Sequence, residues 1–369
     1  MSPDEAGPVR AEDAFDVDRV AAWLRDHAEE SWRDRLAGTP EVRQFPGGAS
    51  NLTYSLRYPD ADLILRRPPS GAKARGAHDM GREHRIQQAL APVFPLVPEM
   101  VAHCDDEAVL GRPFYVMTRV DGVIPRRELG LDLSAEQTSD LCGDVWEVLV
   151  RLHSVDLDAT GLRSLGKGVG YVGRQVAGWT TRLGNATTDD LGDWSDVTGW
   201  IEAHQPPDIA TCLIHNDFRL DNLVLTSSRS LRSERSERLE GRPAVAAVLD
   251  WEMATVGDPL MDLGGSMAYW VQDDDDEFFR QFRRQPSNAP GMWSRARIVE
   301  HYCERMGFSV TPEQWRFYEV FGLFRLAVIA QQIWYRYHHR QTTNEAYAVF
   351  GPAVGYLEQR VRAVLSGSA

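Results

Sequence analysis

The feature that most constrains this chain is a run of polar residues between two short apolar segments, within residues 213–225. The run fits the pattern H-x-D-x-x-x-x-N, with Asp217 and Asn222 five positions apart. Further along, a second apolar run over residues 244–249 ends at Asp250. Short apolar runs bounded by polar residues are consistent with buried strands. The pattern therefore predicts two strand-like segments with polar side chains gathered at their ends.

This set of residues suits phosphoryl transfer, which needs an oriented acceptor hydroxyl and metal ions that neutralise the phosphates. An aspartate in a loop, such as Asp217, can accept the hydroxyl proton. The side-chain oxygens of Asn222 and Asp250 are the ligands that Mg²⁺ prefers. A single motif of this kind also arises by chance, and Asp and Asn are common in ordinary turns. The ordered series of strand, motif, strand and carboxylate favours the catalytic interpretation.

Three other residues of the segment are expected to support it. His215 is predicted to shape the loop through hydrogen bonds, since a histidine there need not carry a proton. Asp258 and Asp262 follow Asp250 closely, and they are predicted to brace the loop and to cap a helix.

The predicted secondary structure changes along the chain. Residues 1–18 are expected to form a loose leader, and an amphipathic helix is expected over residues 18–36. Strand-like runs follow up to residue 120, and the remainder reads mainly as helix, with capping boxes at Ser134 with Gln137 and at Thr311 with Pro312 and Gln314. Residues 227–241 are expected to form an exposed insertion. The order predicts an α+β protein with two lobes, residues 19–120 and 121–369.

Composition limits the classes of partner and the cellular location that are expected. The formal net charge is −14, which argues against nucleic acid or an anionic membrane surface as the partner. The four cysteines lie far apart, which favours reduced thiols over a disulfide framework or a zinc site. The N-terminus is acidic and does not read as a signal peptide, and no apolar run approaches the roughly 20 residues of a spanning helix. A cytoplasmic protein is expected.

The chain resembles the aminoglycoside phosphotransferase/choline kinase superfamily, which has the protein-kinase-like fold. More narrowly, it is similar to the kinase-like domain linked to acyl-CoA dehydrogenases and to its stand-alone bacterial relatives. The similarity covers nearly the whole chain from about residue 40. It is carried by residues 214–222, 248–252, 257–259, 262–263 and 65–71.

The resemblance implies a fold with a small strand-rich N-terminal lobe and a larger, mainly helical C-terminal lobe. It implies ATP and Mg²⁺ as cofactors. By the same resemblance Asp217 is the catalytic base or orients the acceptor, and Asn222 and Asp250 hold magnesium. Arg219 falls where protein kinases carry a lysine near the γ-phosphate, so it is expected to neutralise charge during transfer.

The nucleotide-binding residues are also expected from the resemblance. The family folds a turn over the phosphates where this chain has Gly47, Gly48, Ser50 and Asn51. On the next strand kinases place a lysine paired to a helix glutamate. Here the strand supplies Arg66, with Glu83 as its expected partner, and the geometry of its fork differs from that of a lysine ammonium. Residues from Met117 to Arg119 are expected to form the hinge that binds adenine.

The motifs do not specify the phosphate acceptor, and three candidates are considered. The narrower resemblance suggests a hydroxyl of a small molecule such as a hydroxyacyl-CoA. An aminoglycoside is the second candidate, which the negative charge favours. A third is a non-catalytic regulatory relative that binds a nucleotide or an acyl-CoA, which Arg66 keeps open and which the intact Asp217, Asn222 and Asp250 oppose.

Overall fold

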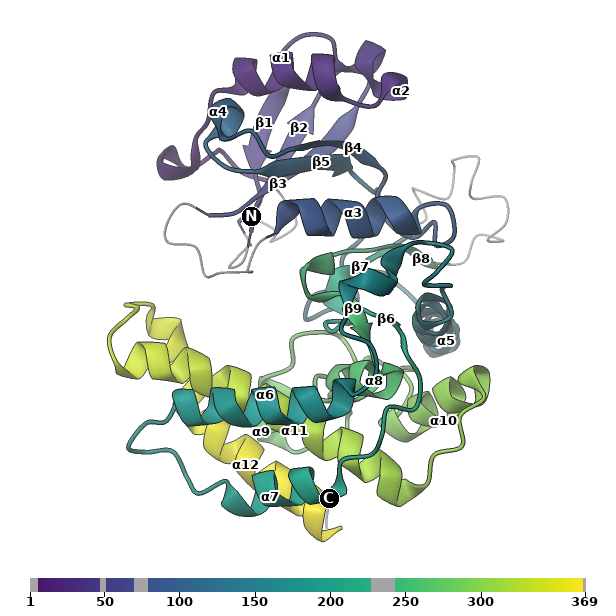
Figure 1. Ribbon diagram of the computed structural model, residues 1–369, viewed down its shortest axis with the longest axis vertical. Coiled ribbons are helices and arrows are strands. Elements are labelled where there is room, and N and C mark those ends of the chain that lie inside the picture. Colours follow the sequence, from purple (N-terminus) through teal and green to yellow (C-terminus); the bar gives the residue numbers. More distant parts are fainter. Residues whose placement is uncertain (1–5, 47–50, 70–78, 227–242, 368–369) are drawn as a thin grey trace. The chain divides into compact units, whose positions relative to one another are not determined.

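The computed structural model describes residues 6–46, 51–69, 79–226 and 243–367. The chain divides into two compact units, whose elements are drawn in Figure 1. Unit 1 comprises Met1–Ile124 and Asn222–Glu252, and unit 2 comprises Pro125–Asp221 and Met253–Ala369. The segment Asn222–Glu252, which the sequence assigned to the helical lobe, thus packs with the strand-rich unit. The insertion expected at residues 227–241 lies outside the described residues.

Unit 1 is built on an antiparallel sheet of five strands in the order β1-β2-β3-β5-β4 (Figure 1). Side chains along a strand alternate between its two faces. In β3, Leu63 and Leu65 join the larger apolar cluster of the unit, while Ile64 joins a smaller one with Met80 of α3. Arg66 comes two positions after Ile64, so the alternation directs it toward the face that α3 covers. The elements of the sheet and its helices are β1 Glu41–Gln44, β2 Leu52–Arg57, β3 Asp62–Arg67, β4 Met100–Cys104, β5 Phe114–Thr118, α1 Val17–His27, α2 Glu30–Arg33, α3 Met80–Leu90 and α4 Glu107–Leu110.

The single helix expected over residues 18–36 is interrupted. It ends at His27, and a short α2 and a 3-10 turn over Asp34–Leu36 follow. Ala28 and Glu29 are extended, and the Glu29 backbone N–H donates to the Val101 carbonyl of β4 at 3.1 Å. The hydrophobic pattern continues across the break because both pieces cover the same apolar cluster. Tertiary hydrogen bonding has therefore overridden the helical period.

The described part of the expected loose leader is also packed. Asp13 is 7% exposed. Its backbone oxygen accepts bonds from Tyr54 Oη at 2.9 Å and from Arg67 Nη2 at 2.7 Å, and its side chain accepts one from Gln44 Nε2 at 2.8 Å. Residues 6–16 therefore form part of unit 1.

A second, two-stranded ladder completes unit 1. It pairs β7 (Leu223–Leu225) with β8 (Val245–Val248) in antiparallel register. Val123 forms a bridge to Leu225, and the Val248 N–H donates to the Leu96 carbonyl at 2.7 Å. A Cβ atom on Gly122 would lie 2.3 Å from the Leu225 oxygen, so this close approach requires glycine. These bonds tie the late segment to the early one.

Unit 2 is mainly helical, with one short antiparallel pair, β6 and β9. Both predicted capping boxes are confirmed: Ser134 with Gln137 opens α5, and Thr311 with Gln314 opens α11. No helix among the described residues is long and apolar enough to cross a membrane. The elements are α5 Ala135–His153, α6 Tyr171–Asn185, α7 Ser195–His204, β6 Cys212–Ile214, β9 Thr255–Gly257, α8 Pro259–Met267, α9 Glu277–Gln281, α10 Arg295–Met306, α11 Pro312–His338 and α12 Phe350–Ser366.

The core of unit 2 reaches the Asp217 loop through aromatic rings. Trp146 of α5 is 1% exposed and packs against Phe218, with ring centroids 5.9 Å apart, and against Trp270 at 5.3 Å. Large buried aromatic rings contribute most to core stability. Phe218 thus attaches the Asp217 loop to the aromatic core of unit 2.

We predict that Trp146→Ala lowers the free energy of unfolding by about 3–5 kcal/mol, because it leaves a large cavity under the loop. The measurement is urea unfolding followed by circular dichroism. Val169→Ala is the control, since Val169 is 80% exposed and its loss should change stability by less than about 0.5 kcal/mol. A loss below about 1 kcal/mol for Trp146→Ala would contradict the role given to this ring.

Candidate active site

The Asp217 loop begins at the end of β6, and one buried carboxylate fixes its start. Asp262 of α8 accepts backbone N–H bonds from His215 at 2.7 Å and from Asn216 at 2.8 Å. Its Oδ2 atom lies 3.1 Å from His153 Nε2. Burial alone would raise the pKa of Asp262, but the hydrogen bond and charge of His153 hold it below its usual range. Such charge-assisted bonds are strong, so the loop starts from a fixed point.

The residue before Asp217 has a left-handed backbone, with φ of 65° at Asn216. This conformation is costly for residues other than glycine and persists where neighbours hold it. Three neighbours do so. Tyr171 Oη donates to Asn216 Oδ1 at 3.1 Å, Asn216 Nδ2 donates to the Met253 oxygen at 3.0 Å, and Arg325 Nη2 donates to the Asn216 oxygen at 2.8 Å.

The Asp217 carboxylate is oriented by Arg219. Arg219 Nη2 donates to Asp217 Oδ2 at 3.1 Å, and Arg219 Nε lies 3.1 Å from Oδ1. The guanidinium in turn lies over the Tyr269 ring, 4.7 Å from its centroid, which is a favourable cation–π contact. The Asp217 N–H lies 3.3 Å from His215 Nδ1. Arg219, expected to act on the phosphate, is thus in contact with Asp217 itself.

A second carboxylate lies beside this pair and was not singled out from the sequence. Asp221 Oδ1 is 3.4 Å from Arg219 Nε. Burial raises the pKa of Asp221, Arg219 opposes that effect, and the charge of Asp217 adds to it. Arg219 therefore balances two acidic groups in unit 2.

Asp258, predicted as a brace and cap, is the N-cap residue of α8. Its Oδ1 atom accepts from the N–H groups of Leu260 at 2.9 Å and Met261 at 3.0 Å, and Oδ2 accepts from that of Ile209 at 2.6 Å. Burial raises its pKa to about 6.

In unit 1, the ladder of β7 and β8 brings Asn222 and Asp250 to the same end. Leu223 pairs with Val248, and the Leu249 N–H donates to the Asn222 oxygen at 2.8 Å. Asn222 directly precedes β7, and Asp250 comes two residues after β8. Asp250 also has a left-handed backbone, with φ of 66°. Two oxygen-bearing side chains at one end of a ladder fit a Mg²⁺ ion.

The expected pairing of Arg66 with Glu83 is present, and it is part of a larger network. Arg66 Nη1 donates to Glu83 Oε2 at 3.1 Å and lies 3.2 Å from Tyr115 Oη. Arg66 Nη2 donates to Asp250 Oδ1 at 3.0 Å. Burial would lower the pKa of Arg66, but Tyr115, Asp250 and Glu83 together hold it well above its usual range. Arg66 therefore carries its charge in a buried setting.

Asn51 extends this network on the other side of Glu83. Its Nδ2 atom lies 3.2 Å from Glu83 Oε1 and 3.2 Å from Glu252 Oε2. Arg82 Nη1 donates to the Glu252 oxygen at 3.1 Å. Burial raises the pKa of Glu83, and the charge of Arg66 opposes that rise. Asn51, expected among the nucleotide-binding residues, thus contacts acidic side chains in this structure.

The expected hinge follows β5. Met117 pairs with Ile64 of β3, and the Arg119 N–H donates to the Asp62 oxygen at 3.0 Å. Arg119 Nη1 also donates to Asp62 Oδ2 at 3.2 Å. The remaining predicted nucleotide-binding residues lie outside the described residues: Gly47, Gly48 and Ser50.

Two members of the unit 1 network, Tyr115 and Glu252, were not predicted. The register could have indicated Tyr115, since it pairs directly with Arg66 and residues opposite each other share a face. Glu252 lies two positions after Asp250, within residues 248–252, which carry the family resemblance. No local pattern, however, indicates that Asn51 contacts it from 201 residues away.

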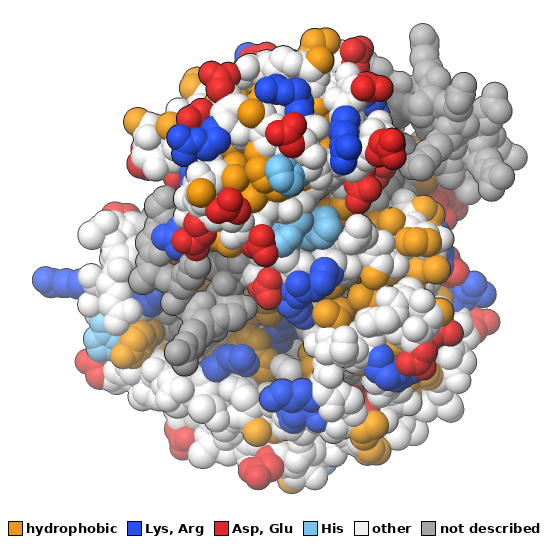
Figure 2. Space-filling view, turned by 45° about the horizontal axis from the view of Figure 1, so that its top comes forward, with side chains coloured by type: hydrophobic (Ala, Val, Ile, Leu, Met, Phe, Trp, Pro, Cys, Tyr) orange, Lys and Arg blue, Asp and Glu red, His pale blue; other side chains and the backbone are white. Residues whose placement is uncertain are grey.

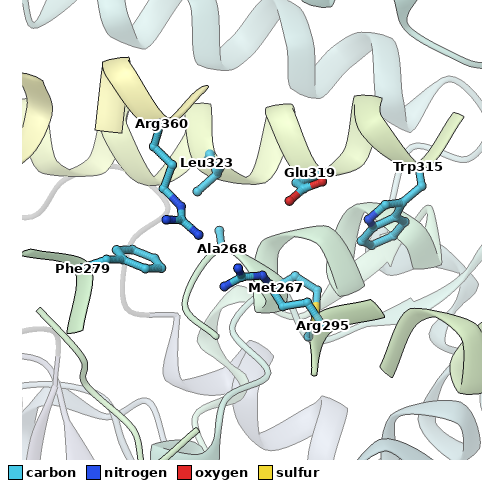
Figure 3. Close-up of a pocket in the computed structure, with 8 residues that line it drawn as sticks. All are labelled: Met267, Ala268, Phe279, Arg295, Trp315, Glu319, Leu323 and Arg360. Atoms are coloured by element: carbon cyan, nitrogen blue, oxygen red, sulfur yellow. The ribbon is translucent and has the colours of Figure 1, made fainter. Parts of the chain in front are cut away.

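A separate pocket lies among the helices of unit 2 (Figure 3). Its volume of about 20 Å³ suits roughly one water molecule. The two arginines drawn there, Arg295 and Arg360, form ion pairs with Asp275. The pocket is thus part of the packing of unit 2. It is lined by Met267, Ala268, Phe279, Arg295, Trp315, Glu319, Leu323 and Arg360.

The negative charge of the chain is not gathered in one area of the face drawn in Figure 2. Both acidic and basic side chains are exposed on this face.

Sequence comparison identifies relatives for most of the chain. The pattern of the phosphotransferase enzyme family matches residues 41–299. Acyl-CoA dehydrogenase family member 10 of Mus musculus is 36% identical over 330 residues, which make up 89% of this chain and 29% of the mouse protein. Acyl-CoA dehydrogenase family member 11 of Homo sapiens is 30% identical over 341 residues, 92% of this chain and 42% of the human protein. The chain therefore spans less than half the length of these relatives.

Solved structures resemble the chain over nearly its whole length. A Ralstonia eutropha protein provisionally described as an aminoglycoside phosphotransferase matches with a TM-score of 0.77 and 29% identity, covering 96% of this chain and 99% of that one. A choline/ethanolamine kinase family protein from Mesorhizobium loti matches with a TM-score of 0.55 and 17% identity, covering 94% of each chain. Spectinomycin phosphotransferase, solved with ADP and spectinomycin, matches with a TM-score of 0.54 and 11% identity, covering 95% of this chain and 98% of that one. The predicted α+β, protein-kinase-like fold is confirmed.

We predict that Asp262→Asn lowers stability at pH 7 by about 3 kcal/mol, because it removes the charge opposite a buried histidine. The pKa of Asp262 is lower in the folded chain than the value of about 3.9 in an unfolded chain. Its contribution is therefore complete above the unfolded pKa and is lost as the pH falls through the folded pKa. The variant should lose less stability than the wild type as the pH falls below about 4.

Urea unfolding at a series of pH values measures this difference. Asp60→Asn is the control, because Asp60 is exposed and should leave the pH profile as in the wild type. Equal acid losses in the wild type and Asp262→Asn would exclude the proposed role of Asp262.

Proposed function

Because the chain belongs to the phosphotransferase enzyme family, we propose that it transfers the γ-phosphate of ATP to a hydroxyl group of a small molecule. The observation that carries this proposal is the set of three side chains with oxygen atoms suited to phosphoryl transfer, those of Asp217, Asn222 and Asp250. Asp217 stands on a rigidly held loop of unit 2, and Asn222 and Asp250 stand at one end of a ladder in unit 1. Phosphoryl transfer needs such groups and little covalent chemistry.

In this proposal Asp217 accepts the proton of the acceptor hydroxyl. The acceptor oxygen then forms a bond to the γ-phosphorus, while the bond from that phosphorus to the bridging oxygen of ADP breaks, and ADP leaves with the electron pair. Arg219 contacts both oxygens of Asp217. We therefore propose that Arg219 acts mainly by orienting this carboxylate, in addition to the charge that it brings near the phosphate.

Asn222 and Asp250 are the residues that would hold magnesium. When bound, Mg²⁺ supplies positive charge against the phosphate oxygens. The chain's own part is to present these two ligands from fixed backbone positions, since Leu249 ties Asn222 to the segment of Asp250.

The nucleotide would lie on unit 1. By family resemblance, backbone groups at residues 117–119 would bind adenine, and Gly47, Gly48, Ser50 and Asn51 would contact the phosphates. Support for ATP comes from the family and from the ADP bound in spectinomycin phosphotransferase.

For the acceptor we propose a hydroxyacyl-CoA. Two observations support it. The named relatives are acyl-CoA dehydrogenase family members, although this chain spans only part of them. In unit 2, Arg325 contacts the residue next to Asp217 and lies 5.4 Å from the centroid of Trp179. A cation and an aromatic ring near the loop suit an anionic acceptor better than a polycationic aminoglycoside.

We predict that ATP with Mg²⁺ raises the melting temperature of the protein, since a ligand that binds only the folded state stabilises it, by about 2.7 kcal/mol at a hundredfold excess over Kd. Asp250→Ala should lose most of this shift, because it removes a charged metal ligand. Asp60→Asn, which changes an exposed carboxylate of the same unit, should keep it. Absence of a shift in the wild type would reject the nucleotide assignment, and it would favour the non-catalytic interpretation if an acyl-CoA still bound.

Mass spectrometry tests the reaction itself. The wild type should add one phosphoryl group to a 3- or 4-hydroxyacyl-CoA in the presence of ATP and Mg²⁺, and should leave the matching acyl-CoA without a hydroxyl unchanged. Asp217→Asn should bind ATP normally and transfer about 10²–10⁴ times more slowly. Transfer to aminoglycosides, choline or sugars alone would correct the acceptor, and normal turnover by Asp217→Asn would reject the assigned base.

A further inference from the structure

Arg66 makes contacts that a lysine at its position could not all make. The two terminal nitrogens of its guanidinium bind different partners: Nη1 contacts Glu83 and Tyr115, and Nη2 contacts Asp250. The Arg66 side chain is 12% exposed and that of Glu83 is 1% exposed. A lysine has a single nitrogen, whereas the planar fork of arginine presents donors in two directions.

The fork joins three segments of unit 1. Arg66 belongs to β3, Glu83 to α3, and Asp250 to the segment after β8. Tyr115 Oη also donates to Glu83 Oε2 at 2.9 Å, so the glutamate is held from two sides. Because Glu83 and Tyr115 fix one edge of the guanidinium, its other edge has a defined direction. Asp250 is therefore held by a group that is itself immobilised.

The contact leaves part of Asp250 available. Arg66 binds the Oδ1 atom, and a third of the side chain, 33%, is exposed. Magnesium is usually bound through one or two carboxylates, with water and phosphate oxygens completing its coordination. One oxygen of Asp250 can thus remain on Arg66 while the other binds a metal ion. Ligating carboxylates are commonly held in this way by hydrogen bonds from a second residue.

The local charge fits the same arrangement. Arg66 is opposed by Glu83 and Asp250, and Glu252 adds a third carboxylate through Asn51. Because Arg82 donates to the Glu252 oxygen, two guanidinium groups face three acidic groups within this network, which leaves it with an excess of negative charge. Such an excess attracts a divalent cation even though Arg66 already contacts Asp250.

We infer that Arg66 is a positioning residue, which binds Asp250 Oδ1 and so directs the remaining oxygen toward a divalent metal ion, rather than a residue that grips phosphate. The inference rests on the proposed role of Asp250 as a metal ligand. It gives the arginine at this position a function that differs from that of the lysine in protein kinases.

Titration of the full-length protein with Mn²⁺ in the presence of ADP, followed by electron paramagnetic resonance of free Mn²⁺, tests the inference. We expect Arg66→Lys to weaken Mn²⁺ binding by about 10- to 100-fold, as is typical when a residue that supports a metal ligand is changed. The affinity for ADP without metal should change by less than about threefold, because Arg66 does not contact phosphate. Arg35→Lys is the matched control, since Arg35 is an exposed arginine of the same unit.

Two results would overturn the inference. Unchanged or tighter Mn²⁺ binding by Arg66→Lys would mean that Arg66 does not help Asp250 or competes with the metal. A loss of metal-free ADP affinity as large as the loss of Mn²⁺ affinity would mean that Arg66 binds phosphate.

A double variant covers the case in which Arg66→Lys does not fold. Arg66→Met with Glu83→Leu replaces the buried pair by apolar side chains, a change that proteins often tolerate, and it should weaken Mn²⁺ binding to a similar degree. Asp250→Ala separates the two proposals. If it binds Mn²⁺ like the wild type, the metal assignment of the proposed function fails; if it loses binding while both Arg66 variants keep it, only the inference fails.

Discussion

The organisation of both units depends on one constraint: a charge removed from water must be paired and hydrogen-bonded. In unit 2 one such charge is Asp262, and its partners are His153 and the backbone of His215 and Asn216. In unit 1 it is Arg66, with Glu83 and Asp250 as partners. Each pairing fixes a segment next to a candidate catalytic group. The same bonds that satisfy the buried charges therefore set the direction of the Asp217 loop and of Asp250.

Two of the left-handed residues, Asn216 and Asp250, take part in these pairings. Asn216 and Asp250 have φ values of 65° and 66°, and neither is a glycine. Such backbone conformations cost free energy and persist where surrounding bonds hold them. Asn216 is held by bonds to both its side chain and its backbone, and Asp250 by the fork of Arg66. Each of these two residues adjoins, or is itself, a group assigned to the reaction.

The sequence predicted those parts that depend on local patterns. The two capping boxes are found where a Ser or Thr precedes a Gln by three residues. The pairing of Arg66 with Glu83 was also predicted, through the resemblance. What could not be predicted are partners chosen over long separations, such as Arg66 with Asp250 across 184 residues and His153 with Asp262 across 109. The break after His27 belongs to the same class, because a carbonyl of β4 causes it.

The grouping of Asn222–Glu252 with unit 1 shows why residue order alone was not sufficient. Along the chain this segment lies within the helical part, and its own residues predict only two strands and a carboxylate. Its backbone bonds to Val123 and Leu96 are among those that join it to the first unit. Asn222 and Asp250 thereby share a unit with Arg66, while Asp217 belongs to the other unit.

The proposed roles are that Asn222 and Asp250 bind the metal and that Arg66 positions Asp250. They are most directly tested by a crystal structure with Mn²⁺ and a non-hydrolysable ATP analogue, in which anomalous scattering locates the metal. We predict a metal peak bound by the side-chain oxygens of both Asn222 and Asp250, with Arg66 still on Asp250 Oδ1. A metal bound elsewhere, or an Arg66 that has left Asp250 for the phosphates, would contradict the assignment of these residues.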